Sequence, residues 1–276
     1  MAMTARISTL QQLHQVQLEA LCELDRVCKL HDIRWFLHGG TLLGALRHGG
    51  PIPWDDDVDV AMLREDYDRF VELAVPDLDP RFVFNDHAHD DEFFDFVPRI
   101  SDIAYEYPVA DAYSSKFVEG HEHPDMDIFV FEPACDGLRD KVQSFMLKMN
   151  TAQAMGHRAF VDHAEFSGAS KIASYVFPAL GKRKTLEALL AKRMRLAGWG
   201  NEASGKLRVP NDIVTSMDFR FERCWYDGER TIDFGGVELP IPVGAEHELD
   251  EVYHGKWREL PPVEGRKPQH AALEYR

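Results

Sequence analysis

The sequence predicts an α/β fold of the α+β kind, in which helices flank a mixed β-sheet and a helical insertion interrupts the chain. The first observation is the stretch 7–31, whose apolar residues are spaced three and four apart, as in an amphipathic helix packed on a sheet. The second is a short apolar run at 35–37, followed by alternation of valine and aspartate at 57–62, which predicts two strands. The third is the return of helical spacing at 138–160 and 186–196.

Shorter segments complete the assignment. The expected elements are a helix at 63–75, strands at 81–84, 93–100 and 125–131, a hairpin at 229–241 and a short helix at 246–254. Pro261 and Pro262 then favour an extended tail. Residues 166–181, which are dotted with glycine and serine, resist assignment.

Composition narrows the function classes. The chain of 276 residues carries a formal net charge of −16, which argues against a nucleic-acid binder because such proteins normally show a basic surface. No apolar run approaches twenty residues and no signal-peptide pattern opens the chain, so a soluble, cytoplasmic protein is expected. The four cysteines are scattered without a Cys-x-x-Cys pair, which predicts free and mostly buried thiols in a reducing compartment.

The most informative stretch begins with a glycine pair. Gly39 and Gly40 end the first apolar strand, and Thr41 is placed to N-cap a short helix at 42–47. The free backbone N–H groups of a helix start beside glycines bind phosphate well. This element therefore predicts a phosphate-binding turn.

An acidic strand follows the glycine element. Its period of two predicts that Asp57 and Asp59 share one face. Two crowded carboxylates repel each other unless a cation lies between them, and hard oxygen ligands suit Mg²⁺ shared with substrate phosphates. An isolated Asp-x-Asp is more often a solvated acidic turn, but the glycine element immediately upstream favours a metal site.

Two residues farther along the chain extend this prediction. Asp127 opens a wholly apolar run, where a carboxylate is costly without a partner. We expect it to be a third metal-facing carboxylate; the alternative is a helix or turn cap. Arg99 follows another apolar run, so its guanidinium is expected at a strand end, either as a clamp for phosphate or carboxylate or in a salt bridge to a neighbouring aspartate.

The order of these motifs resembles a known family. A glycine pair followed by an Asp-x-Asp strand resembles the signature of the nucleotidyltransferase fold. The string at 39–62, GGTLLGALRHGGPIPWDDDVDVAM, resembles the LicD family of phosphotransferases, which includes the bacterial phosphorylcholine transferases and the fukutin-related proteins. Weaker similarity continues through 127–129, 253–255 and 260–262 to His270. The resemblance covers nearly the whole chain and is least secure at 137–212.

The resemblance implies a fold and a reaction. The fold would be a nucleotidyltransferase-like mixed sheet, and the reaction a metal-dependent transfer that uses Mg²⁺ or Mn²⁺. The donor would be a CDP-activated alcohol such as CDP-choline, from which phosphocholine or a similar phospho-alcohol is transferred and CMP leaves. The acceptor would be a hydroxyl of a glycan, a glycolipid or a teichoic-acid precursor.

The chemistry of phosphoryl transfer assigns roles to these residues, because it demands charge neutralisation, positioning and an activated hydroxyl. The expected metal ligands are Asp57, Asp59 and Asp127. The residues expected to bind substrate are His38, Gly39, Gly40, Thr41, Arg99 and His270. Arg47 and His48 would neutralise the phosphate that transfers or leaves, and Asp55 or Asp127 would act as general base.

Three regions are expected along the chain. Residues 1–136 would form the catalytic core, 137–212 a mainly helical insertion on the acceptor side, and 213–276 a hairpin and C-terminal segment that complete the catalytic domain. The basic stretch 182–195 would hold an anionic lipid-linked acceptor through peripheral contact at the inner face of the membrane; the alternative is a solvated helix face.

Two other functions fit parts of the pattern. The first is a nucleotidyltransferase that moves a nucleoside monophosphate onto a small molecule, and the second is an inactive glycan-binding scaffold. The string around Arg47 and His48 argues against the first, and the presence of all three candidate metal carboxylates argues against the second.

Overall fold

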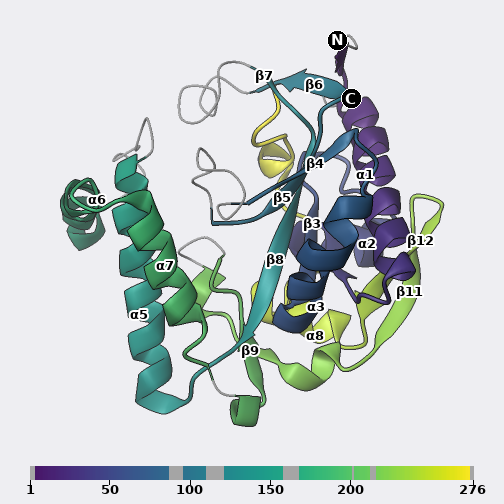
Figure 1. The fold of residues 1–276 in the computed structure, drawn as a ribbon. Helices are drawn as coiled ribbons and strands as arrows, with labels where there is room; N and C mark the ends of the chain where they lie inside the picture. Colours follow the sequence, from purple (N-terminus) through teal and green to yellow (C-terminus); the bar gives the residue numbers. More distant parts are fainter. Residues whose placement is uncertain are drawn as a thin grey trace.

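The computed structural model describes residues 4–86, 96–109, 121–157, 168–200, 202–211 and 216–273. Its centre is a mixed sheet of seven strands, which confirms the predicted fold class (Figure 1). The strands are β2 (Phe36–Leu37), β3 (Asp59–Leu63), β4 (Phe82–Asn85), β5 (Arg99–Asp102), β8 (Asp125–Pro133), β9 (Lys206–Arg208) and β10 (Phe221–Glu222). β8 runs parallel to β3 on one side, and on the other it pairs antiparallel with β5 near its start and with β9 near its end.

Helices cover one face of this sheet. They are α1 (Leu10–Leu30), α2 (Gly39–His48) and α3 (Arg64–Arg69), which continues as a π-helical turn at Phe70–Ala74. The predicted helices at 7–31 and 63–75 are thereby confirmed. Thr9 begins α1 with a capping box that it forms with Gln12. The largest core cluster lies under these helices and includes Leu21, Leu24, Val60 and Ile128.

The other face of the sheet carries an aromatic cluster. Phe36, Phe131, Phe221 and Tyr226 pack there, with Phe131 and Phe221 ring centroids 5.0 Å apart. Alternation along β3 and β8 separates the two clusters, since even-numbered residues face the helices and odd-numbered residues face the aromatic rings.

The start of α2 differs from the prediction. Thr41 is not its N-cap: the helix begins three residues earlier than predicted, at Gly39, with His38 at the cap position and no side-chain cap bond. Gly39 opens the helix at a φ of +53°, which allows the chain to turn into a helix directly after β2. The Thr41 hydroxyl instead accepts the backbone N–H of Asp59 at 2.8 Å, so it ties the helix to the neighbouring strand.

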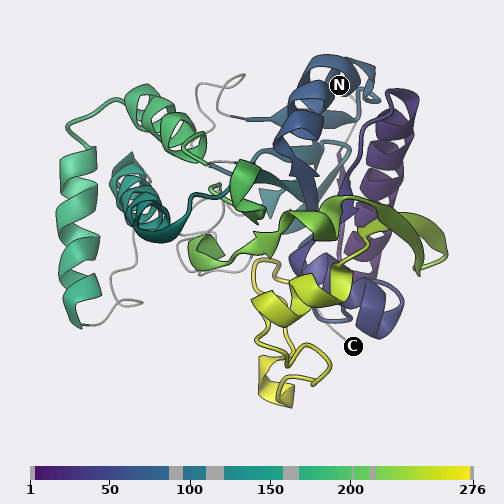
Figure 2. The same ribbon diagram turned by 90° about the horizontal axis from the view of Figure 1, so that it is seen from below.

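A separate helical layer stands beside the sheet, as Figures 1 and 2 show. It consists of α5 (Gly137–Ala154), α6 (Gly168–Gly181) and α7 (Leu186–Ala197). The predicted helices at 138–160 and 186–196 correspond to α5 and α7, although 158–160 lie outside the described residues. α6 falls in the stretch that the sequence left unassigned and contains Pro178 within the helix. The division of the chain at residues 136 and 212 stays a prediction.

The C-terminal part contains the predicted hairpin and short helix. They are β11 (Glu229–Phe234) with β12 (Val237–Pro242), and α8 (Ala245–Val252). Gly235 and Gly236 both adopt positive φ in the hairpin turn. The tail then crosses the molecule, and Ala271 forms a bridge with Val109.

Short elements complete the described chain. Three strands, β1 (Ala5–Arg6), β6 (Tyr105–Pro108) and β7 (His121–Glu122), form a small sheet. Single 3-10 turns lie at Val75–Asp77, Met155–His157, Glu202–Ser204, Ser216–Asp218, Arg223–Tyr226 and Val263–Gly265. Of the predicted strand at 93–100, the part at 93–95 lies outside the described residues. Within the described ranges no helix is both long and apolar enough to cross a bilayer.

The packing of α1 generates a stability prediction. Leu24 is fully buried under the sheet, whereas Leu30 on the same helix is 62% exposed. Leu24→Ala should therefore lower the free energy of unfolding by about 2–5 kcal/mol because it leaves a cavity. Leu30→Ala should change it by less than about 0.5 kcal/mol. Urea denaturation monitored by circular dichroism measures both, and equal losses would contradict the position of α1.

Candidate active site

A row of charged residues crosses the middle of the sheet. In the strand register Arg99 of β5 lies opposite Asp127 of β8, which lies opposite Asp59 of β3. Neighbouring strands are about 4.8 Å apart and residues in register project to the same face, so the two carboxylates stand side by side. Asp127 lies within β8 and not at a turn. The sequence therefore predicted correctly that Asp59 and Asp127 lie on strands, and the register brings them together.

Arg99 is surrounded by carboxylates. Its Nε lies 3.5 Å from Asp127 Oδ1, and one terminal nitrogen lies 3.2 Å from Asp125 Oδ2 and 3.8 Å from Glu122 Oε1. Of the two roles that the sequence left open, the ion pair to a neighbouring aspartate is present. The clamp role stays a prediction. Glu122 and Asp125 were absent from the predicted set, because only the folding of β5, β7 and β8 together brings them to Arg99.

Asp57 lies outside the strand on which it was predicted. β3 begins at Asp59, and Asp57 stands before it on an exposed loop. The strand therefore begins two residues later than predicted, whereas Val58 and Val60 share the core face as the period of two predicts. Its Oδ1 lies 2.8 Å from His270 Nδ1, which comes from the far end of the chain. The structure thus brings two predicted site residues, Asp57 and His270, together.

Asp56 explains why the loop departs from the strand. Its buried carboxylate accepts the backbone N–H groups of Gln269 at 3.2 Å, His270 at 2.7 Å and Ala271 at 2.5 Å. Burial opposes ionisation, but these hydrogen bonds and the His270 side chain outweigh it and lower the pKa of Asp56. Asp56 was not predicted, since the run of three aspartates gives no sign of which one is buried.

Helix α1 holds the same loop from the other side. The His14 ring lies 2.7 Å from the carbonyl oxygen of Asp55, and Gln17 donates to the carbonyl oxygen of Asp56 at 2.8 Å. The acidic loop is therefore fixed by α1 and by the tail together.

The glycine pair makes room for carboxylates. A Cβ on Gly40 would stand 2.9 Å from Asp55 Oδ2, and one on Gly39 would stand 3.1 Å from Asp59 Oδ2. Both acids thus lie against the N-terminal turn of α2, whose partial positive charge favours them. Burial, and next the charges of Asp57 and Asp56, raise the pKa of Asp55 to about 7. Several carboxylates are therefore crowded together at the start of α2.

His38 lies in the core beneath this turn. Its Nδ1 is 2.6 Å from Glu248 Oε1, and Glu248 Oε2 accepts the Tyr226 hydroxyl at 2.6 Å. The ring packs against Phe129 and Phe131. These contacts fix the chain at the entrance to α2, and a direct contact of His38 with substrate stays a prediction.

Arg47 and His48 stand at the other end of α2. Arg47 Nη1 donates to the carbonyl oxygens of Trp257 and Glu259, both at 3.0 Å, and its Nε donates to His48 Nε2 at 2.9 Å. Eight residues of helix separate Arg47 from Gly39, which corresponds to about 12 Å. The pair therefore lies at a different part of the site from the glycine turn, and its contact with phosphate stays a prediction.

Tyr253 is a neighbour of the acidic site that the predicted set omitted. Burial, and then the negative charges of Asp55 and Asp59, raise the pKa of its hydroxyl. The resemblance at 253–255 was the signal that pointed to it.

The donor atoms fit a hard divalent cation. Asp55, Asp57, Asp59 and Asp127 offer only carboxylate oxygens, the ligands that Mg²⁺ and Mn²⁺ prefer. In the described ranges, Asp56, Asp57 and His270 have potential ligand atoms that all lie within 4.8 Å of one another. Burial lowers the pKa of His270, but its bonds to the two aspartates outweigh this and raise the pKa to about 11. The protonated His270 therefore acts as a cation toward Asp57.

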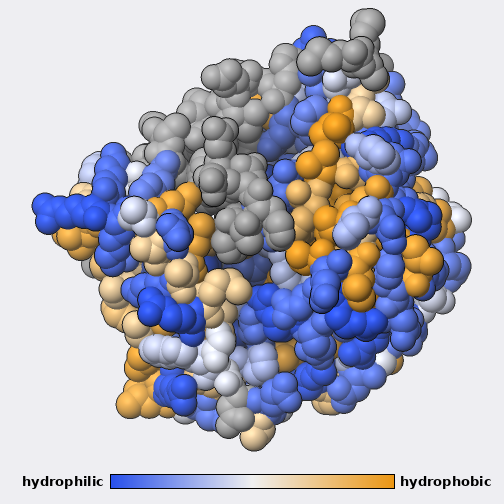
Figure 3. Space-filling view, viewed as in Figure 1, coloured by the Kyte–Doolittle hydropathy of each residue, from blue (hydrophilic) through white to orange (hydrophobic). Residues whose placement is uncertain are grey.

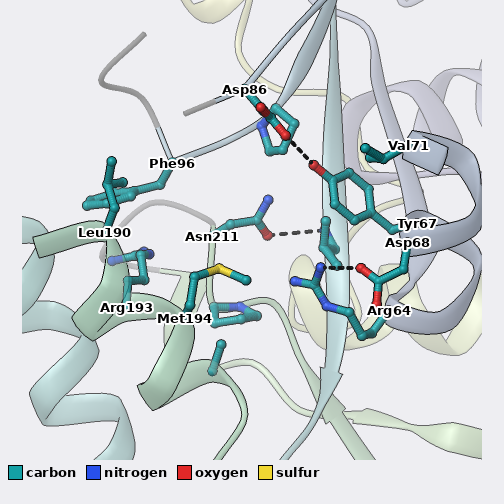
Figure 4. Close-up of a pocket in the computed structure, with 14 residues that line it drawn as sticks. Arg64, Tyr67, Asp68, Val71, Asp86, Phe96, Leu190, Arg193, Met194 and Asn211 are labelled. Carbon is teal, nitrogen blue, oxygen red and sulfur yellow. Dashed lines mark hydrogen bonds and ion pairs between the residues drawn. The ribbon is translucent and has the colours of Figure 1, made fainter. Parts of the chain in front are cut away.

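A cavity of about 250 Å³ lies elsewhere, between α3, β8 and α7 (Figure 4). Tyr67, Val130 and Met194 contribute to its lining. Val130 is an even-numbered residue of β8 and faces away from Asp127, so this cavity is on the opposite face of the sheet from the charged row.

The Asp56 contacts generate a prediction. Asp56→Asn removes the charge and one acceptor oxygen from a buried cluster of N–H donors, so it should destabilise the fold by about 1–3 kcal/mol. Backbone amides at 269–271 should exchange faster with deuterium, as mass spectrometry measures. The matched control is Asp68→Asn, which is exposed and should leave this exchange unchanged. Unaltered protection of 269–271 in Asp56→Asn would contradict the proposed anchoring of the tail.

The chain is similar to known proteins, over one domain and along nearly its whole length. Residues 32–163 match the family model for the LicD/FKTN/FKRP nucleotidyltransferase domain. The chain is 24% identical over 285 residues to the lipopolysaccharide cholinephosphotransferase LicD of Haemophilus influenzae. This alignment covers 97% of this chain and 98% of that protein. A match of 53 residues at 49% identity to the human ribitol 5-phosphate transferase FKRP covers 18% of this chain and 11% of that protein. Residues 32–163 therefore form a domain of the LicD/FKTN/FKRP nucleotidyltransferase type, and the chain is similar along nearly its full length to a LicD phosphotransferase.

Proposed function

We propose that the protein transfers phosphocholine, or a similar phospho-alcohol, from a CDP-activated donor to a hydroxyl of a glycan, a glycolipid or a teichoic-acid precursor. The observation that carries this proposal is the charged row of Arg99, Asp127 and Asp59 beside the glycine start of α2. The similarity along the full chain to a lipopolysaccharide cholinephosphotransferase supports a glycan acceptor.

The bond changes follow from this substrate class. The acceptor oxygen attacks the phosphorus that carries the alcohol, and the bond from that phosphorus to the bridging oxygen of CMP breaks. CMP leaves with the electron pair, and the proton of the acceptor hydroxyl passes to a carboxylate. The protein must therefore neutralise phosphate oxygens, align donor and acceptor, and take up one proton.

Asp57, Asp59 and Asp127 would hold the cation. When bound, Mg²⁺ or Mn²⁺ supplies positive charge to the diphosphate oxygens and so favours departure of CMP. The chain itself supplies the remaining donors. Thr41 accepts the Asp59 N–H with its oxygen, so its hydroxyl proton remains for a phosphate oxygen. Arg99 provides the cationic end of the row.

Asp55 is the better general base of the two candidates. Asp127 is ion-paired with Arg99 and is also an expected metal ligand, so two cations would already engage its carboxylate. Asp55 lies beside Gly40 at the start of α2, and its pKa, raised to about 7 by burial and by Asp57 and Asp56, suits the uptake of a proton near neutral pH. Arg47 and His48 would neutralise a phosphate oxygen farther along α2.

We place the reaction in the cytoplasm, with peripheral contact at the inner face of the membrane. The basic stretch at 182–195 supports this placement.

A nucleotidyltransferase acting on a small molecule would use a similar acidic row. Release of CMP from CDP-choline, as opposed to pyrophosphate from a nucleoside triphosphate, distinguishes the two; release of neither would indicate a scaffold without activity.

The charged row generates the first functional prediction. Asp57→Asn and Asp59→Asn should each reduce turnover of CDP-choline by roughly a hundredfold or more, because several kcal/mol of charge stabilisation depends on the cation. Asp127→Asn should reduce turnover severely and only weaken CDP binding. Without metal, the melting temperature of Asp59→Asn should not fall, since the change relieves repulsion. Asp57→Asn and Asp127→Asn relieve repulsion too, but each also loses an ion pair, to His270 and to Arg99 respectively.

Metal titration in a thermal-shift assay supplies the independent measurement. The wild type should be stabilised by Mg²⁺, and the three variants should show a smaller shift. Asp68→Asn, an exposed carboxylate outside the row, is the matched control. Near-normal, Mg²⁺-dependent turnover in a variant would exclude that residue as a ligand.

The glycine pair generates a second functional prediction. The methyl group in Gly40→Ala would stand within contact distance of Asp55 Oδ2, so the carboxylate must move. We expect weaker binding of CDP-choline with Mg²⁺ by calorimetry and lower turnover, with Gly40→Val more severe. Gly198→Ala, whose Cβ would meet its nearest neighbour at 3.6 Å, is the control. Unchanged affinity in folded Gly40→Val would contradict a role of this turn in donor binding.

A further inference from the structure

α6 exposes an apolar stripe to solvent. Ile172 is 68% exposed and Val176 is 47% exposed, and Tyr175 and Leu180 are exposed beside them. Spacings of three and four residues place these side chains on one face of the helix. A helix packed against a globular domain normally turns such a face inward, so this stripe is an exception.

The packing of α6 on α5 fixes this orientation. A Cβ on Gly156 would stand 2.2 Å from the carbonyl oxygen of Pro178, and one on Gly181 would stand 1.8 Å from that of Gln153. The backbones therefore approach so closely that only glycine fits at these two positions. Because this side of α6 must face α5, the apolar stripe on the opposite side stays outward.

Positive charge surrounds the stripe. Lys171 precedes it, and Lys182, Arg183 and Lys184 follow the helix, all exposed. Residues 137–200 contain eleven lysines and arginines against four acidic residues, in a chain whose net charge is −16. Burial and the nearby charges of Lys184 and Arg195 lower the pKa of Lys192, as expected where cations crowd together.

The same helical layer carries a second exposed apolar row. On α5 it consists of Leu138, Val142 and Phe145, which recur at helical spacing. Figure 2 places α5 and α6 on the side away from the α1 helix, and Figure 3 shows apolar side chains at the left edge where α6 lies.

We propose that the outer face of α6 docks onto an anionic lipid surface. The apolar stripe would enter the boundary between headgroups and acyl chains, while Lys171 and 182–184 contact anionic headgroups. Both ends of α6 are positively charged. In a two-fold dimer formed through the stripe, the basic end of one helix would therefore lie against a basic end of the other, and the two copies would repel each other. An anionic bilayer neutralises the same charges.

This docking deepens the proposed function and rests on it in one respect, namely that the acceptor is lipid-linked. Binding to the surface would confine the enzyme to the layer in which such an acceptor lies. Binding itself needs neither the donor nor the metal, so it is measurable separately from catalysis.

Co-sedimentation with vesicles tests the proposal on the full chain. The protein should bind phosphatidylcholine vesicles that contain phosphatidylglycerol, bind vesicles of phosphatidylcholine alone far more weakly, and be released by salt. The variant Ile172→Gln with Val176→Gln should weaken binding at least roughly tenfold. Lys182→Gln with Arg183→Gln should also weaken binding at least roughly tenfold, since each positive charge near an anionic surface strengthens binding about fivefold.

Matched controls use exposed residues elsewhere. Leu30→Gln with Val243→Gln replaces apolar residues that are 62% and 48% exposed, and Lys29→Gln with Lys256→Gln removes two exposed charges. Both should bind like the wild type. Absence of binding to the anionic vesicles, or binding that the α6 variants leave unchanged, would overturn the proposal.

Light scattering and an activity assay separate the remaining outcomes. A dimer in solution that Ile172→Gln with Val176→Gln dissociates would overturn the proposal in favour of self-association. CMP release with a water-soluble acceptor should be unchanged in the α6 variants. Vesicle binding without CMP release would support the docking surface and refute the proposed transfer. CMP release without vesicle binding would support the transfer and refute the docking surface.

Discussion

Repulsion among carboxylates is the constraint on which the rest of this site depends. The parallel register of β3 and β8 places Asp59 beside Asp127, and the loop before β3 adds Asp55 and Asp57. Such a concentration of charge opposes folding unless other groups compensate. Among the described residues, the groups that compensate include the N-terminus of α2, the guanidinium of Arg99 and the imidazolium of His270.

Compensation by His270 requires that distant parts of the chain meet. Asp56 and His270 are 214 residues apart in sequence, and the contact depends on one buried carboxylate that receives three backbone N–H groups. Gln17 holds the same loop from α1. The acidic loop is therefore built by tertiary contacts and not by the strand that follows it, which leaves Asp57 exposed to a ligand.

Sequence reasoning succeeded where local pattern determines structure. The periodicity of α1 and the alternation of β3 predicted the elements that carry the core, and an aspartate opening an apolar strand placed Asp127 on β8. It failed where a distant segment decides. Asp57 lies before the strand, in a loop that is anchored to the tail. Thr41 accepts a hydrogen bond from β3 instead of capping α2. α6 is stabilised by close backbone contacts at Gly156 and Gly181, which no periodicity reveals.

The uneven charge of the chain has a consistent physical interpretation. A site rich in carboxylates repels anionic substrates over long range, and so a phosphate-bearing donor is expected to approach it only together with cations. The helical layer is basic, so it attracts anions without bound cations. If the acceptor is attached to an anionic surface, this segregation orients the enzyme, because the layer of α5, α6 and α7 is drawn toward the surface while the acidic core is repelled from it. The same division of charge thus favours a bound orientation with the acidic core turned away from the surface, toward the metal ions in solution.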